Sequence, residues 1–310
     1  MKQQAWRQKA AKLLALLCAL ALLATSALAE DAEEAYVENE WNFVDESMDV
    51  TDGIPQDAVG VLERIREAGK LRVATEPFFP PQEFIDPSRE GQEKYVGADM
   101  EMARLIAQRM GVELEIVPME FTQVLAAVSD GECDLAISAL SYTPGRAAAV
   151  ELSKGYYYSQ SSASVGIIIR EAGKDRITGI NDLWDKVIVA QSGSLQEALT
   201  ADSVTAYREF RRLSFIQEVY QALEDGWADA AAVDLETAQA YIGNHPDSRL
   251  MAVPGIQFTL EKHFQGDRVA AKKGEIQLMY FVNGVIDELL ASGQYQAWYQ
   301  EYEALAAALE

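Results

Sequence analysis

The 310-residue chain has few cysteines, few histidines and few basic side chains. Its two cysteines are Cys18, near the N-terminus, and Cys133. Since residues 1–29 are expected to be removed, a single cysteine remains, which excludes an internal disulfide framework. The two histidines, His245 and His263, have no histidine or cysteine three or four residues away. This spacing argues against a metal site, and we expect no cofactor.

Basic side chains are outnumbered by acidic ones, 26 against 49. Residues 1–29 contain four basic side chains and no acidic one, so the rest of the chain has 22 basic and 49 acidic side chains, a net charge of −27. Such a field repels nucleic acid and anionic lipid, and we expect neither as a partner. No internal apolar run reaches the roughly 18 residues of a membrane span.

The one long apolar stretch lies at the start of the chain. Four basic residues precede the apolar run 13–24, and Ala27 and Ala29 are small residues at positions −3 and −1 of a cut before Glu30. This order is typical of a secretory signal peptide. We therefore predict cleavage after Ala29 and a periplasmic or extracellular, cell-surface protein.

Two alternatives concern this N-terminus. The stretch could stay in place as an anchor, or Cys18 could be lipidated at a lipoprotein cleavage site. Leu17 stands directly before Cys18, where lipoprotein processing requires a small residue, and Cys18 lies inside the apolar run. The cysteine is therefore interpreted as part of the apolar run.

The sequence after residue 29 predicts an acidic segment followed by an α/β fold. Residues 30–57 are acidic and lack periodicity, which predicts a spacer or loosely docked arm, disordered in part. From Ala58 on, strands and helices alternate, as in sheets covered by helices. The expected strands are 71–75, 112–117, 135–138, 165–169, 186–190 and 230–233, and the expected helices are 98–110, 121–129, one from about 195, and 216–224.

An internal echo predicts two equivalent halves. A helix, a glycine-containing turn and a small-residue strand over 124–136 recur 95 residues later over 219–231. In open α/β sheets ligands bind beyond the carboxyl ends of strands. If the echo is real, Ser138–Ser141 and Asp234 occupy equivalent places in two facing lobes, although chance similarity of two such units is the alternative.

The residues after the first echo strand suit a carboxylate ligand. Thr143 and Pro144 form an N-cap and a first helical position, which places Arg146 in the first turn of a helix. A cation there opposes the helix dipole, which suggests a purpose such as a guanidinium fork for a carboxylate. In the second half, Asp234 ends a strand, and Ser194 lies in a small, hydroxyl-rich turn that also suits a carboxylate.

The order of these motifs resembles the family 3 extracellular solute-binding proteins, the amino-acid-binding class with the type II periplasmic-binding fold. The likeness covers the chain from about Val61. The stretches that carry it are GKLRVATEPFFPPQEF, YVGADMEMARLIAQRMGVELEIVP, DGECDLAISALSYTPGR, AQSGSLQEAL, DGWADAAAVD and LLASGQYQAWYQEY.

The resemblance implies a division of roles for a bound amino acid. Arg146 holds its carboxylate, helped from the other lobe by Ser194 and the backbone N–H of that serine. Asp234 holds its ammonium group, with Ser141 and the carbonyl of Ala139 as further acceptors. The local alternatives are a solvated surface arginine at 146 and an ordinary helix N-cap at 234.

Three more residues are implied to line the pocket. Ser138 forms part of its wall, while Glu76 and Phe79 contact the side chain of the bound amino acid. This sequence has Glu76 where the family usually has aspartate, and Gln82 where an aromatic residue is common. We expect a polar or cationic side chain to be preferred. The alternatives are a surface carboxylate at 76 and packing between lobes at 79.

The implied architecture is a pair of lobes, each a mostly parallel sheet flanked by helices, joined by a two-strand hinge. Residues 58–158 and 268–310 are predicted to form the first lobe, and 159–267 the second. The crossings near 158–161 and 264–268 are predicted to act as the hinge.

The implied function is capture of a free amino acid between the lobes and its delivery to the membrane subunits of an ABC importer. We expect a monomer that is not an enzyme. The alternative is an exported cyclohexadienyl or arogenate dehydratase on the same fold. Such an enzyme needs a general acid in the cleft, for which Glu76 is the evident candidate.

Overall fold

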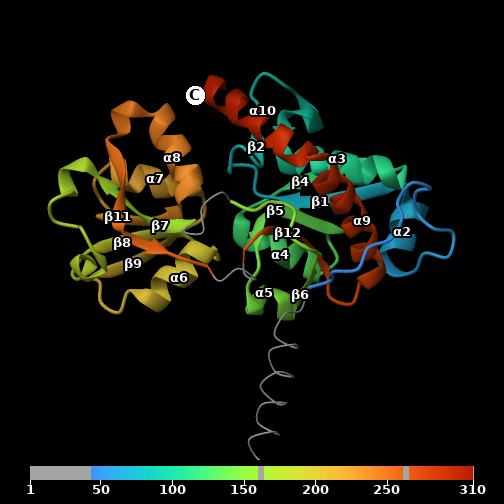
Figure 1. The fold of residues 1–310 in the computed structure, drawn as a ribbon, viewed down its shortest axis with the longest axis horizontal. Coiled ribbons are helices and arrows are strands. Elements are labelled where there is room, and N and C mark those ends of the chain that lie inside the picture. Colours follow the sequence, from blue (N-terminus) through green and yellow to red (C-terminus); the bar gives the residue numbers. More distant parts are fainter. Residues whose placement is uncertain (1–42, 160–163, 261–264, 310) are drawn as a thin grey trace, which may run out of the picture. The chain divides into compact units, whose positions relative to one another are not determined.

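A computed structural model of the chain describes residues 43–159, 164–260 and 265–309 (Figure 1). The predicted signal peptide and its cleavage after Ala29 lie outside the described residues, as do parts of both predicted hinge crossings. The described residues contain two five-stranded sheets and a two-stranded ladder, β2 (Phe84–Ile85) with β3 (Tyr95–Val96).

The first sheet has the strand order β4-β1-β5-β12-β6. Its strands are β1 (Lys70–Thr75), β4 (Glu113–Pro118), β5 (Leu135–Ser141), β6 (Val150–Leu152) and β12 (Asp267–Lys272). Strand β1 runs parallel to β4 and β5, whereas β12 runs antiparallel to β5 and β6. Because β12 comes from a distant part of the chain, two separate stretches build this sheet. We call the sheet and its helices the first lobe.

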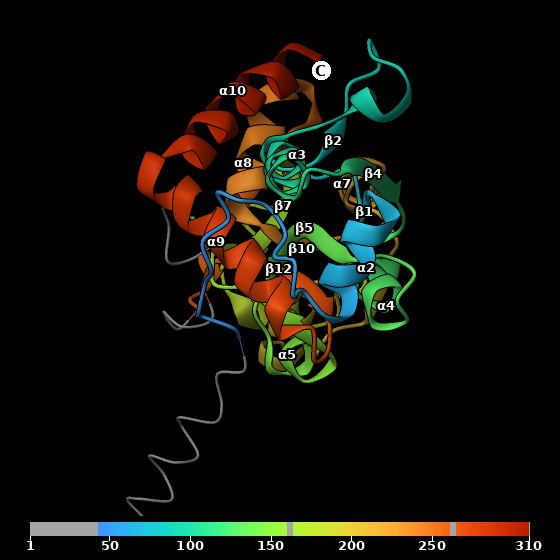
Figure 2. The same cartoon turned by 90° about the vertical axis from the view of Figure 1, so that its right-hand side faces the viewer.

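Helices cover both faces of the first sheet. They are α2 (Gly60–Ala68), α3 (Ala98–Met110), α4 (Phe121–Ser129), α5 (Pro144–Ala149), α9 (Ile276–Ser292) and α10 (Gln294–Leu309). Residues of α2, α3 and α9 share one apolar core with β1 and β5, and α10 packs on α3 and α9 (Figure 2). Helix α3 has its predicted bounds and ends at Gly111, whose φ of 70° forms the C-cap that a residue without a side chain adopts readily.

The second sheet has the order β11-β7-β10-β8-β9. Its strands are β7 (Val165–Arg170), β8 (Val187–Gln191), β9 (Glu209–Leu213), β10 (Ala230–Asp234) and β11 (Leu250–Phe258), and its helices are α6 (Leu195–Ser203), α7 (Ile216–Glu224) and α8 (Leu235–Asn244). Strands β8, β9 and β10 are parallel, and β7 runs antiparallel to both of its neighbours, β10 and β11. We call this sheet and its helices the second lobe.

Both sheets are therefore mixed, with four strands running in one direction and one strand, β12 or β7, running in the opposite direction. The antiparallel strands β7 and β12 each begin directly after a stretch of chain that passes from one sheet to the other. Strand β12 begins at Asp267, one residue before the predicted lobe boundary.

The echo in the sequence corresponds to a structural repeat. The repeated strands, β5 and β10, are each the central strand of their sheet. At the start of each, an aspartate ties the strand to its neighbour: Asp134 Oδ2 accepts the backbone N–H of Arg72 at 2.8 Å, and Asp229 Oδ2 accepts that of Val187 at 2.9 Å. The two strand ends consequently occupy equivalent positions in the two lobes.

The described part of the acidic segment, residues 43–57, packs on the first lobe. The backbone N–H of Val44 donates to Leu152 O at 2.8 Å, and Asn283 Nδ2 donates to the carbonyl oxygens of Val44 and Glu46 at 2.8 Å each. Val50 is buried in the core of the lobe. Residues 43–57 are thus a docked part of the fold, because backbone hydrogen bonds and a few apolar side chains outweigh their acidic composition.

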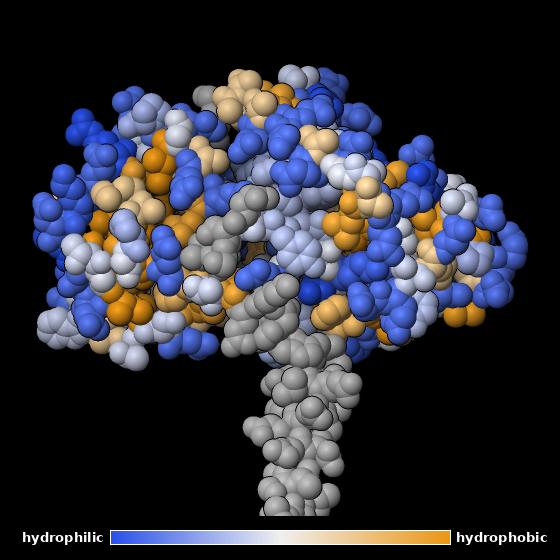
Figure 3. Space-filling model, viewed as in Figure 1, coloured by the Kyte–Doolittle hydropathy of each residue, from blue (hydrophilic) through white to orange (hydrophobic). Residues whose placement is uncertain are grey.

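In the described ranges, no helix combines the length and apolar character that a bilayer crossing needs. Large exposed apolar side chains, such as Trp184 and Trp227, are separate from one another in the sequence. The face in Figure 3 shows hydrophobic residues interspersed with hydrophilic ones. Scattered apolar residues are ordinary on a protein surface.

Candidate functional site

The eight residues predicted to bind a ligand line two adjoining cavities, which we call the cleft site. Cavity volumes are about 70 Å³ and about 30 Å³. Both are lined by Phe79, Ala139, Ser141 and Gln196. The larger cavity adds Asp234, and the smaller adds Glu76, Ser138, Arg146 and Ser194. The carboxyl ends of β5 and β10 thus contribute to one site, as expected of open α/β sheets.

Arg146 reaches the cleft site from helix α5. The predicted cap is confirmed, because the Thr143 side chain accepts the backbone N–H of Arg146 at 3.1 Å and Pro144 begins the helix. Arg146 is buried, so the alternative of a solvated surface arginine is wrong. Its Nη1 donates to Ser141 O at 2.7 Å and its Nη2 to Gly193 O at 3.1 Å.

The electrostatics of Arg146 favour an anionic partner. Burial lowers the pKa of Arg146 to about 10, while the nearby carboxylate of Asp267 raises it. The guanidinium therefore stays charged at neutral pH, and its hydrogen bonds to Ser141 and Gly193 go to neutral carbonyl oxygens. A buried cation without a tightly paired anion is a strong site for a ligand carboxylate.

Glu76 follows strand β1 and is 1% exposed, so the alternative of a surface carboxylate is wrong. Its backbone N–H donates to Ser138 Oγ at 3.0 Å, and its Oε1 is buried with no hydrogen-bond partner. Burial raises the pKa of Glu76 to about 8, and a hydrogen bond with Gln191 lowers it. A carboxylate in such a place gains most from a cationic partner.

Asp234 is both a helix N-cap and a wall of the cleft site. Its Oδ1 accepts the backbone N–H of Thr237 at 2.9 Å, which caps α8. Burial raises the pKa of Asp234 to about 6, and the bond to Thr237 lowers it. The two roles are compatible because a carboxylate has two oxygens.

Ser194 lies in the turn between β8 and α6 and is 7% exposed. Its hydroxyl accepts the backbone N–H of Glu197 at 3.0 Å and caps α6. Gly193 precedes it with φ +75°, and a Glu197 carboxylate oxygen accepts the Gly193 N–H at 2.7 Å. The Ser194 hydroxyl thus caps α6, and Ser194 lines the smaller cavity. The N-terminus of α6 therefore lies at this cavity, and the positive end of a helix dipole favours an anion.

The structure also brings in Asp267 and Glu83, which the sequence reasoning did not assign to the site. Gln82, expected to make one side of the pocket more polar, lines the larger cavity, and its Nε2 donates to Asp267 Oδ2 at 2.8 Å. Burial raises the pKa of Asp267 to about 7. Glu83 lines the smaller cavity. Gln82 and Glu83 lie in the quoted stretch PPQEF, whereas Asp267 had no local signal because it joins the site only through the pairing of β12.

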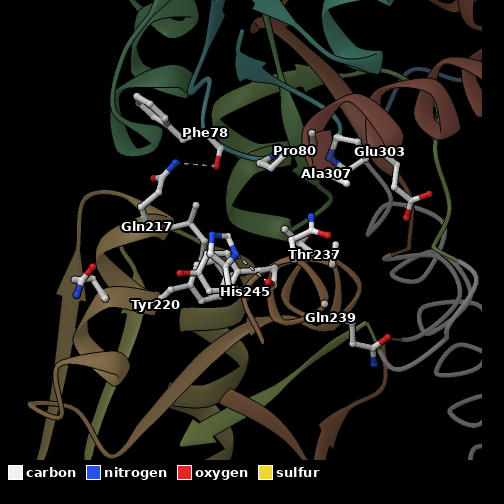
Figure 4. A pocket seen from close by; sticks show the side chains of 17 residues that line it. Phe78, Pro80, Gln217, Tyr220, Thr237, Gln239, His245, Glu303 and Ala307 are labelled. Carbon is white, nitrogen blue, oxygen red and sulfur yellow. Dashed lines mark hydrogen bonds between the residues drawn. The ribbon is translucent and has the colours of Figure 1, made fainter. Parts of the chain in front are cut away.

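A third cavity, of about 450 Å³, lies beside the cleft site (Figure 4). Its walls come from α7, α8 and His245 of the second lobe and from Phe78, Pro80, Pro81 and α10 of the first. Three rings lining it form a stack, Tyr220 on Tyr241 and Tyr241 on His245, with centroids 4.1 Å and 4.0 Å apart. Thr237 lines both this cavity and the larger cavity of the cleft site.

Within the described ranges no group of three or more histidine, cysteine, aspartate or glutamate side chains is arranged to hold a metal ion. The cleft site combines a buried cation, buried carboxylates and hydroxyl groups from two α/β lobes. A guanidinium is a partner for carboxylates, and a carboxylate is a partner for cations.

Comparison with known proteins gives the family. The model of the bacterial extracellular solute-binding proteins, family 3, matches residues 71–304. The chain belongs to this family, which confirms the resemblance seen in its motifs and the fold class that it implied.

Similar proteins include a probable histidine-binding protein of Campylobacter jejuni, 26% identical over 75% of this chain and 84% of that protein. The L-cystine-binding protein of Escherichia coli is 26% identical over 77% of this chain and 84% of its own length. A solved structure is also similar, that of an amino acid ABC transporter substrate-binding protein of Streptococcus pneumoniae bound to L-arginine. It has 31% identity and a TM-score of 0.70, and covers 80% of this chain and 99% of that one.

Proposed function

We propose that this protein captures a free amino acid with a cationic side chain in the cleft site and delivers it to the membrane subunits of an ABC importer. The observation that carries the proposal is that the smaller cavity is lined both by Glu76, whose Oε1 is buried without a hydrogen-bond partner, and by the buried guanidinium of Arg146. The Glu76 carboxyl group suits a cation, and the Arg146 guanidinium suits a carboxylate. An amino acid with a basic side chain carries both of these groups.

The backbone groups of the ligand would be held from both lobes. Arg146 of the first lobe binds the carboxylate, with the N-terminus of α6 at Ser194 supporting it. Asp234 of the second lobe binds the ammonium group, with Ser141 and the carbonyl oxygen of Ala139 as further acceptors. These groups recognise what all amino acids share.

The side chain of the ligand would lie against Glu76, Phe79 and Ser138. Removing the Glu76 carboxylate from water is costly without a partner, and the cost appears as its raised pKa. A guanidinium or ammonium offsets this cost, whereas a neutral side chain leaves Glu76 protonated. The named relatives bind histidine, cystine and arginine, so the family alone does not select among ligands.

The same glutamate supports a second candidate function. A pKa of about 8 keeps the Glu76 carboxyl protonated at neutral pH, as the general acid of a dehydratase requires. The cleft site, however, also contains Arg146 and Asp234, which suit the carboxylate and the ammonium group of an amino acid. We therefore place binding first, with dehydration of arogenate or prephenate as the alternative.

Three further proposals concern the whole protein. We propose that it is exported, with a signal peptide cleaved after Ala29, and that it acts as a monomer. We also propose that residues 58–158 with 268–310 and residues 159–267 move as two lobes about the crossings near 158–161 and 264–268. These proposals are supported by the family and by the assignment of strands to the two sheets.

A thermal-shift series with the twenty amino acids tests the binding function, because a ligand specific to the folded state raises its stability. Arginine, lysine or histidine should raise the melting temperature most, and calorimetric titration should then give one site per chain. A shift only with neutral or acidic amino acids contradicts the cationic preference. Incubation with prephenate and arogenate tests the alternative, and turnover of either would overturn the binding-only function.

A further inference from the structure

Ala139 has an unusual backbone conformation for a residue of the cleft site. Its φ is +47°, and it lines both cavities. A residue with a Cβ atom is disfavoured in this left-handed region, and it stays there only when its surroundings hold it. Asp99, at the start of helix α3, supplies such a hold, because its Oδ2 accepts the backbone N–H of Ala139 at 3.0 Å.

The Asp99 carboxylate is itself held by hydrogen bonds from two other parts of the first lobe. Tyr156 Oη donates to the same Oδ2 at 2.8 Å, and Tyr295 Oη, from α10, donates to Oδ1 at 2.6 Å. All three side chains are buried. The carboxylate therefore accepts three donors from separate elements, and its position relative to β5 is closely defined.

Glu83 completes this buried cluster. Its Oε1 accepts Ser138 Oγ at 3.1 Å, and it lines the smaller cavity next to Glu76. Burial and the charges of Asp99 and Glu76 raise the pKa of Glu83 well above its usual range. A protonated Glu83 can donate a hydrogen bond to Asp99, so two buried acids coexist with one negative charge.

We propose that Asp99 is a positioning residue for the ligand: it holds Ala139 in the left-handed conformation that the cleft site requires, and Tyr156 and Tyr295 hold Asp99. The proposal deepens the proposed function and rests on it, since the Ala139 carbonyl is expected to accept a hydrogen bond from the ligand's ammonium group. Asp99 does not line either cavity of the cleft site, so it acts through Ala139.

A glycine rescue separates positioning from a general effect on folding. Asp99→Ala removes the acceptor, and the affinity for the best amino acid of the thermal-shift series should fall at least about tenfold by calorimetry. Adding Ala139→Gly should restore affinity to within about threefold of wild type, because glycine adopts positive φ without strain. Ala139→Gly alone should also bind within about threefold of wild type.

Asp134→Ala is the matched control, since Asp134 is a buried aspartate of the same lobe that accepts a backbone N–H away from the cleft site. It should lower the melting temperature and leave affinity unchanged, and Ala139→Gly should not improve it. If Asp99→Ala binds as wild type does, or if the glycine brings no recovery, the positioning role is overturned. Should Asp99→Ala not fold, Asp99→Asn replaces it, because its single amide oxygen cannot accept all three donors.

A measurement without ligand tests the role of Asp99 independently of the proposed function. The amide hydrogen of Ala139 should exchange slowly in the wild-type protein and at least about tenfold faster in Asp99→Asn, as seen by nuclear magnetic resonance. Equal exchange in both overturns the positioning role. A wild-type protein that binds no amino acid, but shows this difference in exchange, contradicts the proposed function and supports the role of Asp99.

Discussion

The guanidinium of Arg146, on helix α5 of the first lobe, donates a hydrogen bond to the carbonyl oxygen of Gly193 in the second lobe at 3.1 Å. Its hydrogen bond to Ser141 O, at 2.7 Å, stays within the first lobe. The predicted carboxylate anchor is therefore held between two neutral acceptors, one from each lobe. A ligand carboxylate that binds Arg146 will meet the N-terminus of α6 at the same time.

Arg146→Ala should weaken amino-acid binding at least some thirtyfold. Truncating one partner of a buried charge pair costs roughly 2–5 kcal/mol, at about 1.4 kcal/mol per tenfold change. Calorimetric titration measures the change. Arg109→Ala is the control, because Arg109 pairs with Glu288 away from the cleft site, and it should bind as wild type does. Binding of Arg146→Ala within about threefold of wild type contradicts the assigned role.

Asp234→Asn should weaken binding to a comparable degree, again some thirtyfold or more. The ammonium group loses its countercharge, whereas the cap of α8 survives because asparagine is as good an N-cap as aspartate. The melting temperature without ligand should therefore stay near that of wild type. If Asp234→Asn leaves both the affinity and the melting temperature unchanged, Asp234 acts only as the N-cap of α8 and does not bind the ligand.

Glu76→Gln should change the ranking of ligands more than it changes binding in general. Cationic amino acids lose their countercharge, whereas a neutral ligand such as glutamine finds an amide in place of a protonated acid. In the wild type, a cationic ligand should expel the proton from Glu76, so its affinity should rise as pH increases towards 8. Titrations in buffers of different ionisation enthalpy measure that proton, and its absence contradicts pairing with Glu76.

The protein without ligand should lose stability between about pH 5 and pH 8. Burial raises the pKa of Glu76 to about 8, of Asp267 to about 7 and of Asp234 to about 6. In this window the folded state retains protons that the unfolded chain has released, so raising the pH favours unfolding. Melting temperatures across the window check the slope, and Glu76→Gln should flatten its upper part. A stability that rises over this range contradicts the prediction.

Ligand binding should bring the two lobes closer. Arg146 and Asp234 lie on different lobes, so the ligand contacts both fully only in the closed state and shifts the equilibrium by that difference. Small-angle scattering should give a smaller radius of gyration with saturating ligand. The Arg146→Ala variant, at the same ligand concentration, should keep the larger radius. An unchanged wild-type profile argues against closure.

Much of the fold follows from local patterns. The predicted bounds of α3 and of the helix over 121–129 agree with the structure, because apolar spacing and a terminal glycine or turn define them. The predicted N-cap of α5 at Thr143 is also present, since it depends only on Thr143 and the adjacent Pro144. The strand over 165–169 was predicted, but the antiparallel direction of β7 did not follow from local patterns, and neither did strand β12, because these features are decided by where the chain re-enters a sheet.

The sequence by itself determined the class of this protein and pointed to eight residues, since each motif keeps its recognition groups within a few positions. Only the tertiary structure decided which acids are buried together. Asp99, Glu83 and Asp267 come from a helix start, a loop and a distant strand, and no local spacing relates them. Their environment depends on the pairing of β12 with β5 and on Tyr295 of α10, about two hundred residues from Asp99. Burial and charge at that cluster, rather than residue type alone, set the pKa values of the cleft site.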